Sequence, residues 1–156
     1  MHVMEVKDMQ RAFQEILEGL LESTAASRTT VRLDMPSKNL HLDTVAAEAL
    51  ASGVRSLEED TSINNLSKVP TYEFVERERR ILVQNDCLTA DPAPPAALID
   101  LYGVKAQMLG PIMLDDRVIG IISVHYTLGP RKWTEKDVAA LQNAVERVRR
   151  TVEQRD

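Results

Sequence analysis

The chain has 156 residues, which is the length of one domain with a single sizeable core. Its hydrophobic fraction of 44% and charged fraction of 28% are typical of a globular protein, and its net charge of -5 argues against direct binding to nucleic acid. No apolar run reaches the roughly 20 residues that span a bilayer, and one cysteine can form no internal disulfide, so we expect a cytoplasmic protein without a membrane partner.

The first part of the chain predicts a helix, a strand and a second helix. Apolar residues recur at helical spacing over residues 5–23, and β-branched residues over 29–33 predict a strand. On that strand Arg32 lies on the more polar of the two faces. Residues 44–52 are rich in alanine and predict a helix that ends at Gly53.

The middle of the chain is less regular. Residues 58–69 contain turn-forming residues, and residues 70–79 predict a short helix that opens on a proline and turns Tyr72 inward. A strand is expected over residues 81–83. A further helix is expected over residues 95–103, between a proline and a glycine.

Residues 106–126 predict an antiparallel hairpin at the centre of a sheet. Two apolar runs, 106–114 and 118–126, flank a turn at Asp115-Asp116. Proline cannot donate a ladder hydrogen bond, so Gly110-Pro111 predicts a bulge in the first strand.

The second strand of this hairpin is apolar on both faces, so both faces must be covered and the sheet is expected to be the middle layer. One face turns polar near the end of the strand, at Ser123 and His125, and there we expect a ligand. Alternation assigns Val118, Gly120, Ile122, Val124 and Tyr126 to one face and Ile119, Ile121, Ser123, His125 and Thr127 to the other.

The last helix is expected to begin with a capping box formed by Thr134 and Asp137. Its apolar stripe, together with that of the first helix, offers more surface than one sheet face can cover, so we expect a homodimer through the terminal helices. The alternative is that both stripes are buried on the sheet. The two stripes are Val138, Leu141, Val145, Val148 and Val152, and Met9, Phe13, Ile16 and Leu20.

Three stretches carry a family resemblance that spans nearly the whole chain: SRTTVRLD, then VIGIISVHY, then GPRKWTEKD at the start of a helix. In this order the chain resembles a GAF domain. The resemblance implies an α+β fold, with a central antiparallel sheet and the N- and C-terminal helices on one face. It also implies a ligand pocket on the other face, roofed by segments between Pro36 and Gly103. GAF domains bind many different small molecules or none, so the resemblance names no cofactor.

Cys87 is weighed against the chemistry of GAF relatives. Relatives that reduce free methionine sulfoxide need several cysteines, and bilin-carrying relatives attach their chromophore through a cysteine commonly followed by histidine. Here Cys87 is alone and Leu88 follows it. We expect Cys87 to be a packed and unreactive residue. The three histidines, His2, His41 and His125, have no metal-ligand spacing. Some GAF sensors hold haem through one histidine, and the sequence does not single one out.

The candidate site combines His125, Ser123 and Arg32 as polar groups with apolar walls. We expect an acidic or strongly polar small molecule to pair with Arg32. The alternative is that a loop carbonyl satisfies His125 and an acid such as Asp34 pairs with Arg32. The apolar walls are assigned to Tyr72, Met108 and Ile121, and Phe74 is a further candidate for the roof.

The expected function is that of a stand-alone cytoplasmic GAF-type sensory domain. It would bind a small-molecule effector and signal to a partner such as a regulator or a kinase. One alternative is a small enzyme that acts on a small polar substrate, against which stands the lack of a clear nucleophile–base pair or carboxylate dyad. The other is a ligand-free dimerising adaptor.

Overall fold

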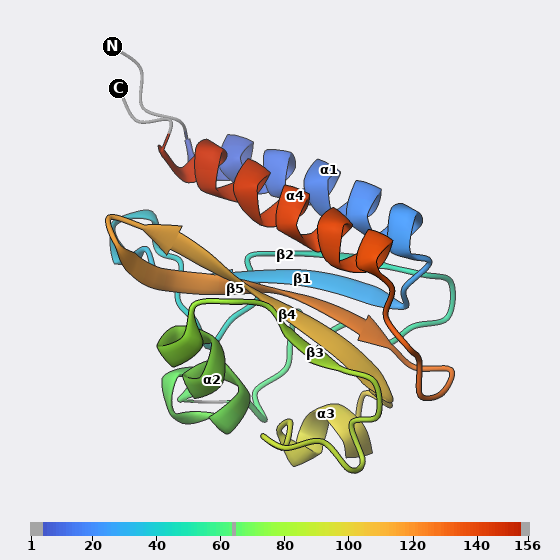
Figure 1. Ribbon diagram of the computed structural model, residues 1–156. Coiled ribbons are helices and arrows are strands. Elements are labelled where there is room, and N and C mark those ends of the chain that lie inside the picture. Colours follow the sequence, from blue (N-terminus) through green and yellow to red (C-terminus); the bar gives the residue numbers. More distant parts are fainter. Residues whose placement is uncertain (1–4, 64, 154–156) are drawn as a thin grey trace.

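The computed structural model describes residues 5–63 and 65–153. A five-stranded antiparallel sheet forms the middle layer, with two long helices on one face and short helices and loops on the other (Figure 1). The sheet order is β2-β1-β5-β4-β3. The elements in chain order are α1 (Val6–Thr24), β1 (Arg28–Leu33), η1 (Pro36–Lys38), β2 (Ala47–Leu50), η2 (Leu66–Lys68), α2 (Pro70–Glu78), β3 (Leu82–Gln84), α3 (Ala96–Asp100), β4 (Ala106–Leu114), β5 (Arg117–Tyr126) and α4 (Glu135–Glu153).

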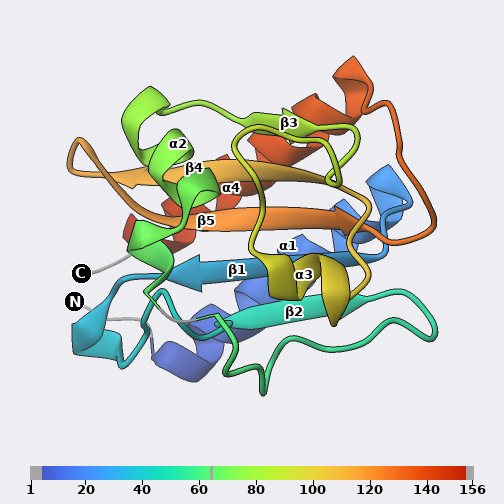
Figure 2. The same cartoon turned by 90° about the horizontal axis from the view of Figure 1, so that it is seen from below.

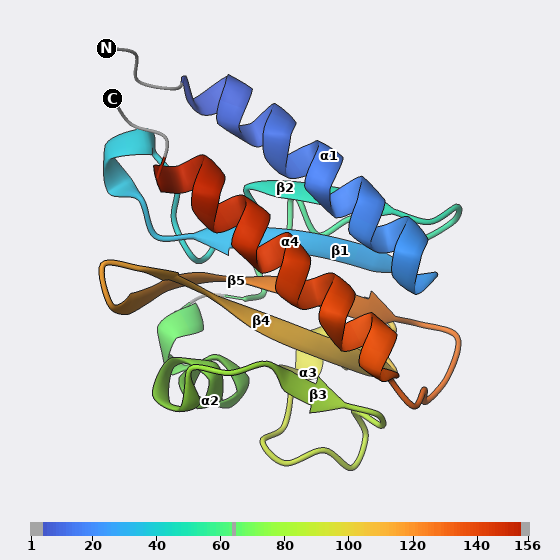
Figure 3. The ribbon, with the colours of Figure 1, turned by 45° about the horizontal axis from the view of Figure 1, so that its top comes forward.

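This arrangement confirms the predicted α+β class and the placement of the terminal helices. α1 and α4 lie side by side over the sheet in Figure 3, while α2 and α3 lie on the opposite face in Figure 2. Both faces of the sheet are therefore covered, which explains why β5 is apolar on both sides. No helix in the described part of the chain is long and apolar enough to cross a membrane.

The apolar stripes of the two long helices are buried within a single chain. Phe13 and Leu17 of α1, and Leu141 and Val148 of α4, are fully buried in the core that lies between the helices and the sheet. The reason given for a homodimer was that one sheet face could not cover both stripes, and that reason is wrong. The helices also contact each other, and Val138 and Val145 of α4 are the stripe residues that stay partly buried.

The predicted capping box of α4 is confirmed. The backbone N–H of Thr134 donates to the Asp137 carboxylate at 2.9 Å, and the backbone N–H of Asp137 donates to the Thr134 hydroxyl at 3.2 Å. Trp133, just before the cap, packs into the helix-side core and donates its indole N–H to the backbone carbonyl of Gln84. The start of α4 is thus tied to the edge strand β3.

The alanine-rich stretch was predicted to be a helix, and that prediction is wrong. Residues Ala47–Leu50 form the edge strand β2, paired with β1. Ala47 and Ala49 lie in the helix-side core, where α1 packs against β2, and a small side chain allows a helix to approach closely. Tertiary packing therefore overrides the helix propensity of alanine here.

The hairpin of β4 and β5 closes as predicted through Asp115 and Asp116. Both residues have positive φ, 50° and 64°, which is the geometry of a two-residue type I′ turn. The predicted bulge at Gly110-Pro111 is wrong, because both residues are paired in register with β5. A Cβ on Gly110 would lie 2.8 Å from Cγ2 of Val145, so this glycine allows α4 to pack closely on the strand.

The irregularity lies instead on β5, at Ile119. Ile112 pairs with Gly120 whereas Met113 pairs with Val118, so Ile119 is the extra residue. This shift exchanges the predicted faces of the two residues before Gly120: Ile119 packs in the helix-side core and Val118 in the core beneath the roof. The faces of Ile121, Ser123 and His125 are as predicted.

Candidate functional site

A small cavity lies between the sheet and its roof. Its volume is about 30 Å³, which is room for about two water molecules. Strands β1, β4 and β5 form its floor, and the roof comes from the loop before η2, η2 itself, the first turn of α2 and the start of α3. The lining residues are Thr30, Arg32, Leu57, Ile63, Leu66, Thr71, Pro95, Leu98, Leu109, Ile121, Ser123 and His125.

Acidic side chains hold the roof segments in place. Asp43 accepts a hydrogen bond from the backbone N–H of Leu66 at 2.9 Å, at the start of η2. Asp60 accepts one from the Tyr102 hydroxyl at 2.6 Å. Such carboxylate bonds to donors are stronger than neutral ones, so a part of the chain with little regular structure still forms a defined cover.

Arg32 brings a buried positive charge to the floor of the cavity. Its side chain comes from β1 and is 4% exposed, and Nη1 donates to the backbone carbonyl of Leu42 at 3.1 Å. Within residues 5–63 and 65–153, no carboxylate forms an ion pair with it, Asp34 included. Burial lowers the pKa of Arg32, the charges of more distant carboxylates, Asp60 first, partly offset this, and a guanidinium remains a cation at neutral pH. A buried cation without a carboxylate partner favours an anionic ligand.

His125 brings a hydrogen-bond donor. Nη1 of Arg28 lies 2.9 Å from Nδ1 of His125, and because a guanidinium can only donate, Nδ1 must be the acceptor. The ring is then neutral and its proton is on Nε2. Burial, and then the charges of Arg28 and Arg32, hold the pKa of His125 well below 6.5, which agrees with a neutral ring. Nε2 is buried and has no hydrogen-bond partner in the described part of the protein.

The structure brings most of the predicted site residues to this cavity. His125, Ser123, Arg32 and Ile121 all line it. Their role in ligand binding stays a prediction. The alternative in which a loop carbonyl satisfies His125 does not describe the structure, since the ring is held by Arg28 instead.

Two predicted wall residues, Tyr72 and Met108, and the roof candidate Phe74 do not line the cavity. Tyr72 is buried in the core beneath the roof, next to the lining residue Thr71, but does not line the cavity itself. Met108 packs in the helix-side core, because its position on β4 alternates with that of the lining residue Leu109. Phe74 is partly buried against the core beneath the roof and does not line the cavity either.

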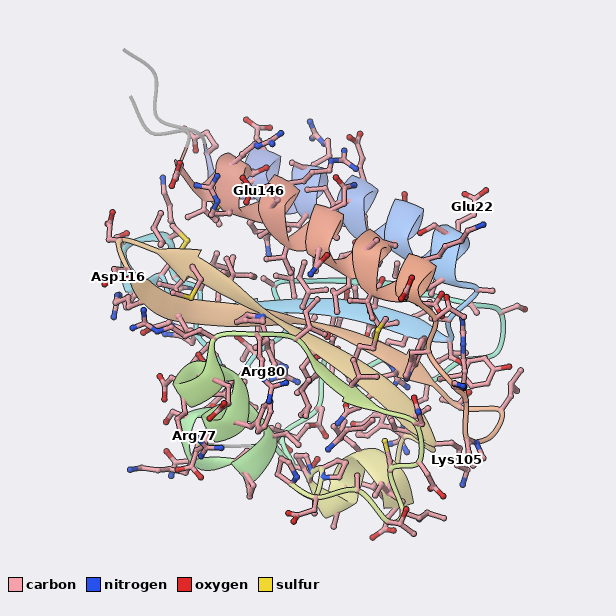
Figure 4. The ribbon with its side chains drawn as sticks, viewed as in Figure 1. Glu22, Arg77, Arg80, Lys105, Asp116 and Glu146 are labelled. Carbon is pink, nitrogen blue, oxygen red and sulfur yellow. The ribbon has the colours of Figure 1, made fainter. Side chains whose placement is uncertain are left out.

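The position of Phe74 is explained by its charged neighbours. The guanidinium groups of Arg77 and Arg80 lie 5.7 Å and 5.0 Å from its ring centroid, and both arginines are labelled in Figure 4. The predicted charged helix face is thus a solvated one, with Phe74 covered by cations at the surface.

Several buried polar residues on the roof face of the sheet were not predicted. Arg28 is fully buried, donates to the backbone carbonyl of Arg55 and lies 3.9 Å from the Glu48 carboxylate. The alternation of β1 puts Arg28 on the same face as Arg32, and this signal was present in the sequence. Gln84 and Gln107 are also buried, and no sequence pattern distinguishes them from surface glutamines.

Cys87 is packed as predicted, in the core beneath the roof, where it is 2% exposed. Burial, and then the negative charge of Asp86, raises the pKa of its thiol to about 12. No group of three metal-ligating side chains lies close enough to hold a metal ion among the described residues, and His2 lies outside them.

Comparison with models of protein families shows which family the chain belongs to. The GAF domain model matches residues 8–152, which is nearly the whole sequence. The chain therefore belongs to the GAF domain family, as its resemblance implied. A comparison with curated proteins finds no match.

Solved GAF domains have the same fold. The cyanobacteriochrome receptor PixJ superposes with a TM-score of 0.79 at 22% identity, over 97% of this chain and 99% of that one. The blue-light-absorbing PixJ domain from Thermosynechococcus elongatus gives 0.73 at 23% identity, over 94% and 88%. The GAF region of a putative membrane protein from Geobacter sulfurreducens gives 0.71 at 18% identity, over 96% and 95%. At these identities the similarity establishes the fold.

Proposed function

We propose that this GAF domain is a cytoplasmic sensor that binds a small acidic or strongly polar effector in the cavity between sheet and roof. The observation that carries the proposal is that His125 lines the cavity together with the buried cation Arg32, and that its buried Nε2–H has no hydrogen-bond partner among the described residues. An unsatisfied buried donor costs ~1–3 kcal/mol, and a bound acceptor would recover that cost.

The size of the cavity supports a small effector over a large chromophore. A volume of about 30 Å³ suits a molecule of a few heavy atoms. In bilin-carrying GAF relatives the attachment point is a cysteine, and here Cys87 is buried with a pKa of about 12. The similarity in fold to cyanobacteriochromes therefore does not favour a covalent chromophore in this chain.

The signal would pass to another protein, such as a regulator or a kinase, by way of the roof segments that surround the cavity. A homodimer through α1 and α4 is a second route. The buried stripes are not available to such a dimer, so it would have to use the outer faces of the two helices.

The experiment is a thermal-shift panel of small organic acids, followed by calorimetric titration of those that stabilise the wild type. Arg32→Met and His125→Leu should each weaken binding by ~1.5–3 kcal/mol, or about tenfold to a hundredfold. Arg32→Lys keeps the charge and should recover part of the loss. The matched control is Arg150→Met on the exposed face of α4, which should bind as the wild type does.

Circular dichroism must show that each variant is folded before titration. Equal affinity of the wild type, Arg32→Met and His125→Leu would overturn the assignment of the site. Turnover of a bound acid would favour the enzyme alternative, and a panel without any ligand would favour the adaptor.

A further inference from the structure

Among the described residues, one charged side chain lines the cavity between sheet and roof, and it is a cation. Arg32 contributes a guanidinium, whereas the ring of His125 is neutral and the other lining residues carry no charge. No carboxylate is part of this lining. Asp60 and Asp43 act on Arg32 only from a distance, without an ion pair. The positive charge is therefore not balanced by the walls of the cavity, which favours an anion inside it.

Three hydroxyl groups also line the cavity. Thr30 of β1 and Ser123 of β5 are paired across the floor, and Thr71 comes from the first turn of α2. All three residues are at most 5% exposed. Their side-chain oxygens form no hydrogen bond in the described part of the protein, and unlike Nε2 of His125 they keep surface that a water molecule can reach. Buried hydroxyls normally have partners, so these three are available to an occupant of the cavity.

Arg32 has hydrogen-bond donors available as well. Its Nη1 donates to the backbone carbonyl of Leu42, and its other N–H groups have no partner among residues 5–63 and 65–153. A guanidinium can only donate, and a hydroxyl can rotate its hydrogen toward an acceptor. The cavity thus offers one buried cation and three hydroxyl donors to whatever it holds.

The size of the cavity restricts this occupant further. A volume of about 30 Å³ holds about two water molecules. As the roof stands, this space suits a single ion, and an acid with a carbon skeleton would have to move the roof outward. A halide ion is one atom of roughly the size of a water molecule, and it accepts hydrogen bonds from any direction without donating one.

We infer that the cavity binds a chloride-sized halide ion. The ion lies beside the Arg32 guanidinium and accepts hydrogen bonds from the hydroxyls of Thr30, Thr71 and Ser123. This inference rests on the cavity of the proposed function and specifies what the cavity holds before an organic effector binds. Such an effector would have to displace the ion and take over its bonds to Arg32.

The first test is thermal unfolding of protein prepared without halide, in sodium chloride and in sodium gluconate at equal ionic strength. Above its dissociation constant, chloride should raise the melting temperature by about 3–5 °C for each tenfold increase in concentration. Bromide should act in the same way. Sulfate, which is too large for the cavity, should give no more than gluconate does.

Variants of the lining residues show whether the effect comes from this cavity. Arg32→Met, checked for folding by circular dichroism, should lose the stabilisation by chloride. Thr30→Val keeps nearly the same shape but removes one donor, so its dissociation constant for chloride should rise about tenfold. Thr89→Val, at an exposed position away from the cavity, is the matched control and should behave as the wild type does.

A diffraction experiment tests the wild type directly and does not depend on the folding of a variant. Crystals grown without chloride and soaked in sodium bromide should show an anomalous peak in the cavity, in contact with Arg32. Peaks on the outer surface alone would mean an adventitious ion only and would overturn the inference.

The outcomes separate this inference from the proposed function. Equal stabilisation by chloride, sulfate and gluconate would be a general salt effect and would overturn the halide site. The proposed function would still stand if an acid of the panel binds the wild type and is lost in Arg32→Met. Conversely, halide binding without binding of any panel acid would support the halide site and overturn the organic effector.

Discussion

His125 contacts the guanidinium group of Arg28 and also feels the charge of Arg32, and its place in the structure depends on its being neutral. Arg28 donates to Nδ1, so a proton on that atom would break the bond and place a second cation beside the first. Glu48 partly balances Arg28 from 3.9 Å, while Arg32 has no ion pair within the described residues. The ring therefore resists protonation for as long as the protein is folded.

The stability of the protein should fall in mild acid because of this residue. The pKa of His125 is held well below 6.5 in the folded state, whereas the unfolded chain takes up a proton near its ordinary value. Below pH 6.5 the unfolded state thus binds more protons, and the free energy of unfolding should fall by up to ~1.4 kcal/mol per pH unit. Urea unfolding between about pH 7.5 and 5 measures this slope. His125→Gln should have a shallower slope, and identical slopes would contradict the prediction.

Cys87 should be unreactive in the folded protein. With a pKa of about 12, very little of its thiol is the reactive thiolate at neutral pH, and the side chain is buried. Ellman's reagent should therefore modify it slowly in buffer and rapidly in concentrated urea. Rapid modification of the folded chain, or loss of effector binding in a folded Cys87→Ser variant, would show that this residue has a chemical role.

At the scale of the elements, the sequence predicted most helices and strands because their periodicity and end signals agree. α4 shows this agreement, with a capping box, a steady apolar stripe and a tryptophan at its start. β2 was missed because alanine favours a helix locally, and only its position between β1 and α1 makes a strand the better solution. The bulge at Ile119 was missed because it is a shift in the pairing of β4 with β5, which one sequence does not show.

The close approach of β5 to β1 leads to a prediction about Gly120, the residue after the bulge. A Cβ at this position would lie 2.0 Å from the backbone oxygen of Arg32, so Gly120→Ala must push β1 and β5 apart. We expect a loss of at least ~3 kcal/mol in the free energy of unfolding. The matched control is Gly19→Ala in α1, where nothing lies within 4 Å of the new Cβ. There we expect a gain of ~0.5–1 kcal/mol. Denaturant melts followed by circular dichroism would test both, and a Gly120→Ala variant as stable as the wild type would contradict the close approach.

At the scale of the whole molecule, the layers and the location of the cavity followed from the sequence, whereas the shape of the cavity did not. His125 and Arg32 could be placed by alternation along one strand each. Arg28 matters because of its partner on a neighbouring strand, and a single sequence does not show such pairings. The homodimer was inferred by weighing apolar surface against one sheet face, without counting the contact between the two helices.

The burial of the helix stripes gives a test at this scale. Leu141 is fully buried in the core of one chain, so Leu141→Asp places a charge in that core and should unfold the protein. Asn143→Asp, on the exposed face of the same helix, is the control and should change little. Light scattering and near-ultraviolet circular dichroism would follow the two variants. A Leu141→Asp variant that forms a well-folded monomer would show instead that the stripe is an interface between copies.

The antiparallel pairing of the two long helices also determines how the domain could be joined to other chains. α1 begins and α4 ends at the same end of the helix layer (Figures 1 and 3). A polypeptide grafted before Val6 and another grafted after Glu153 would thus start from neighbouring points. Placed between the halves of a split fluorescent protein, the domain would therefore hold the two fusion points close together. The same geometry makes it a candidate module for engineered biosensors.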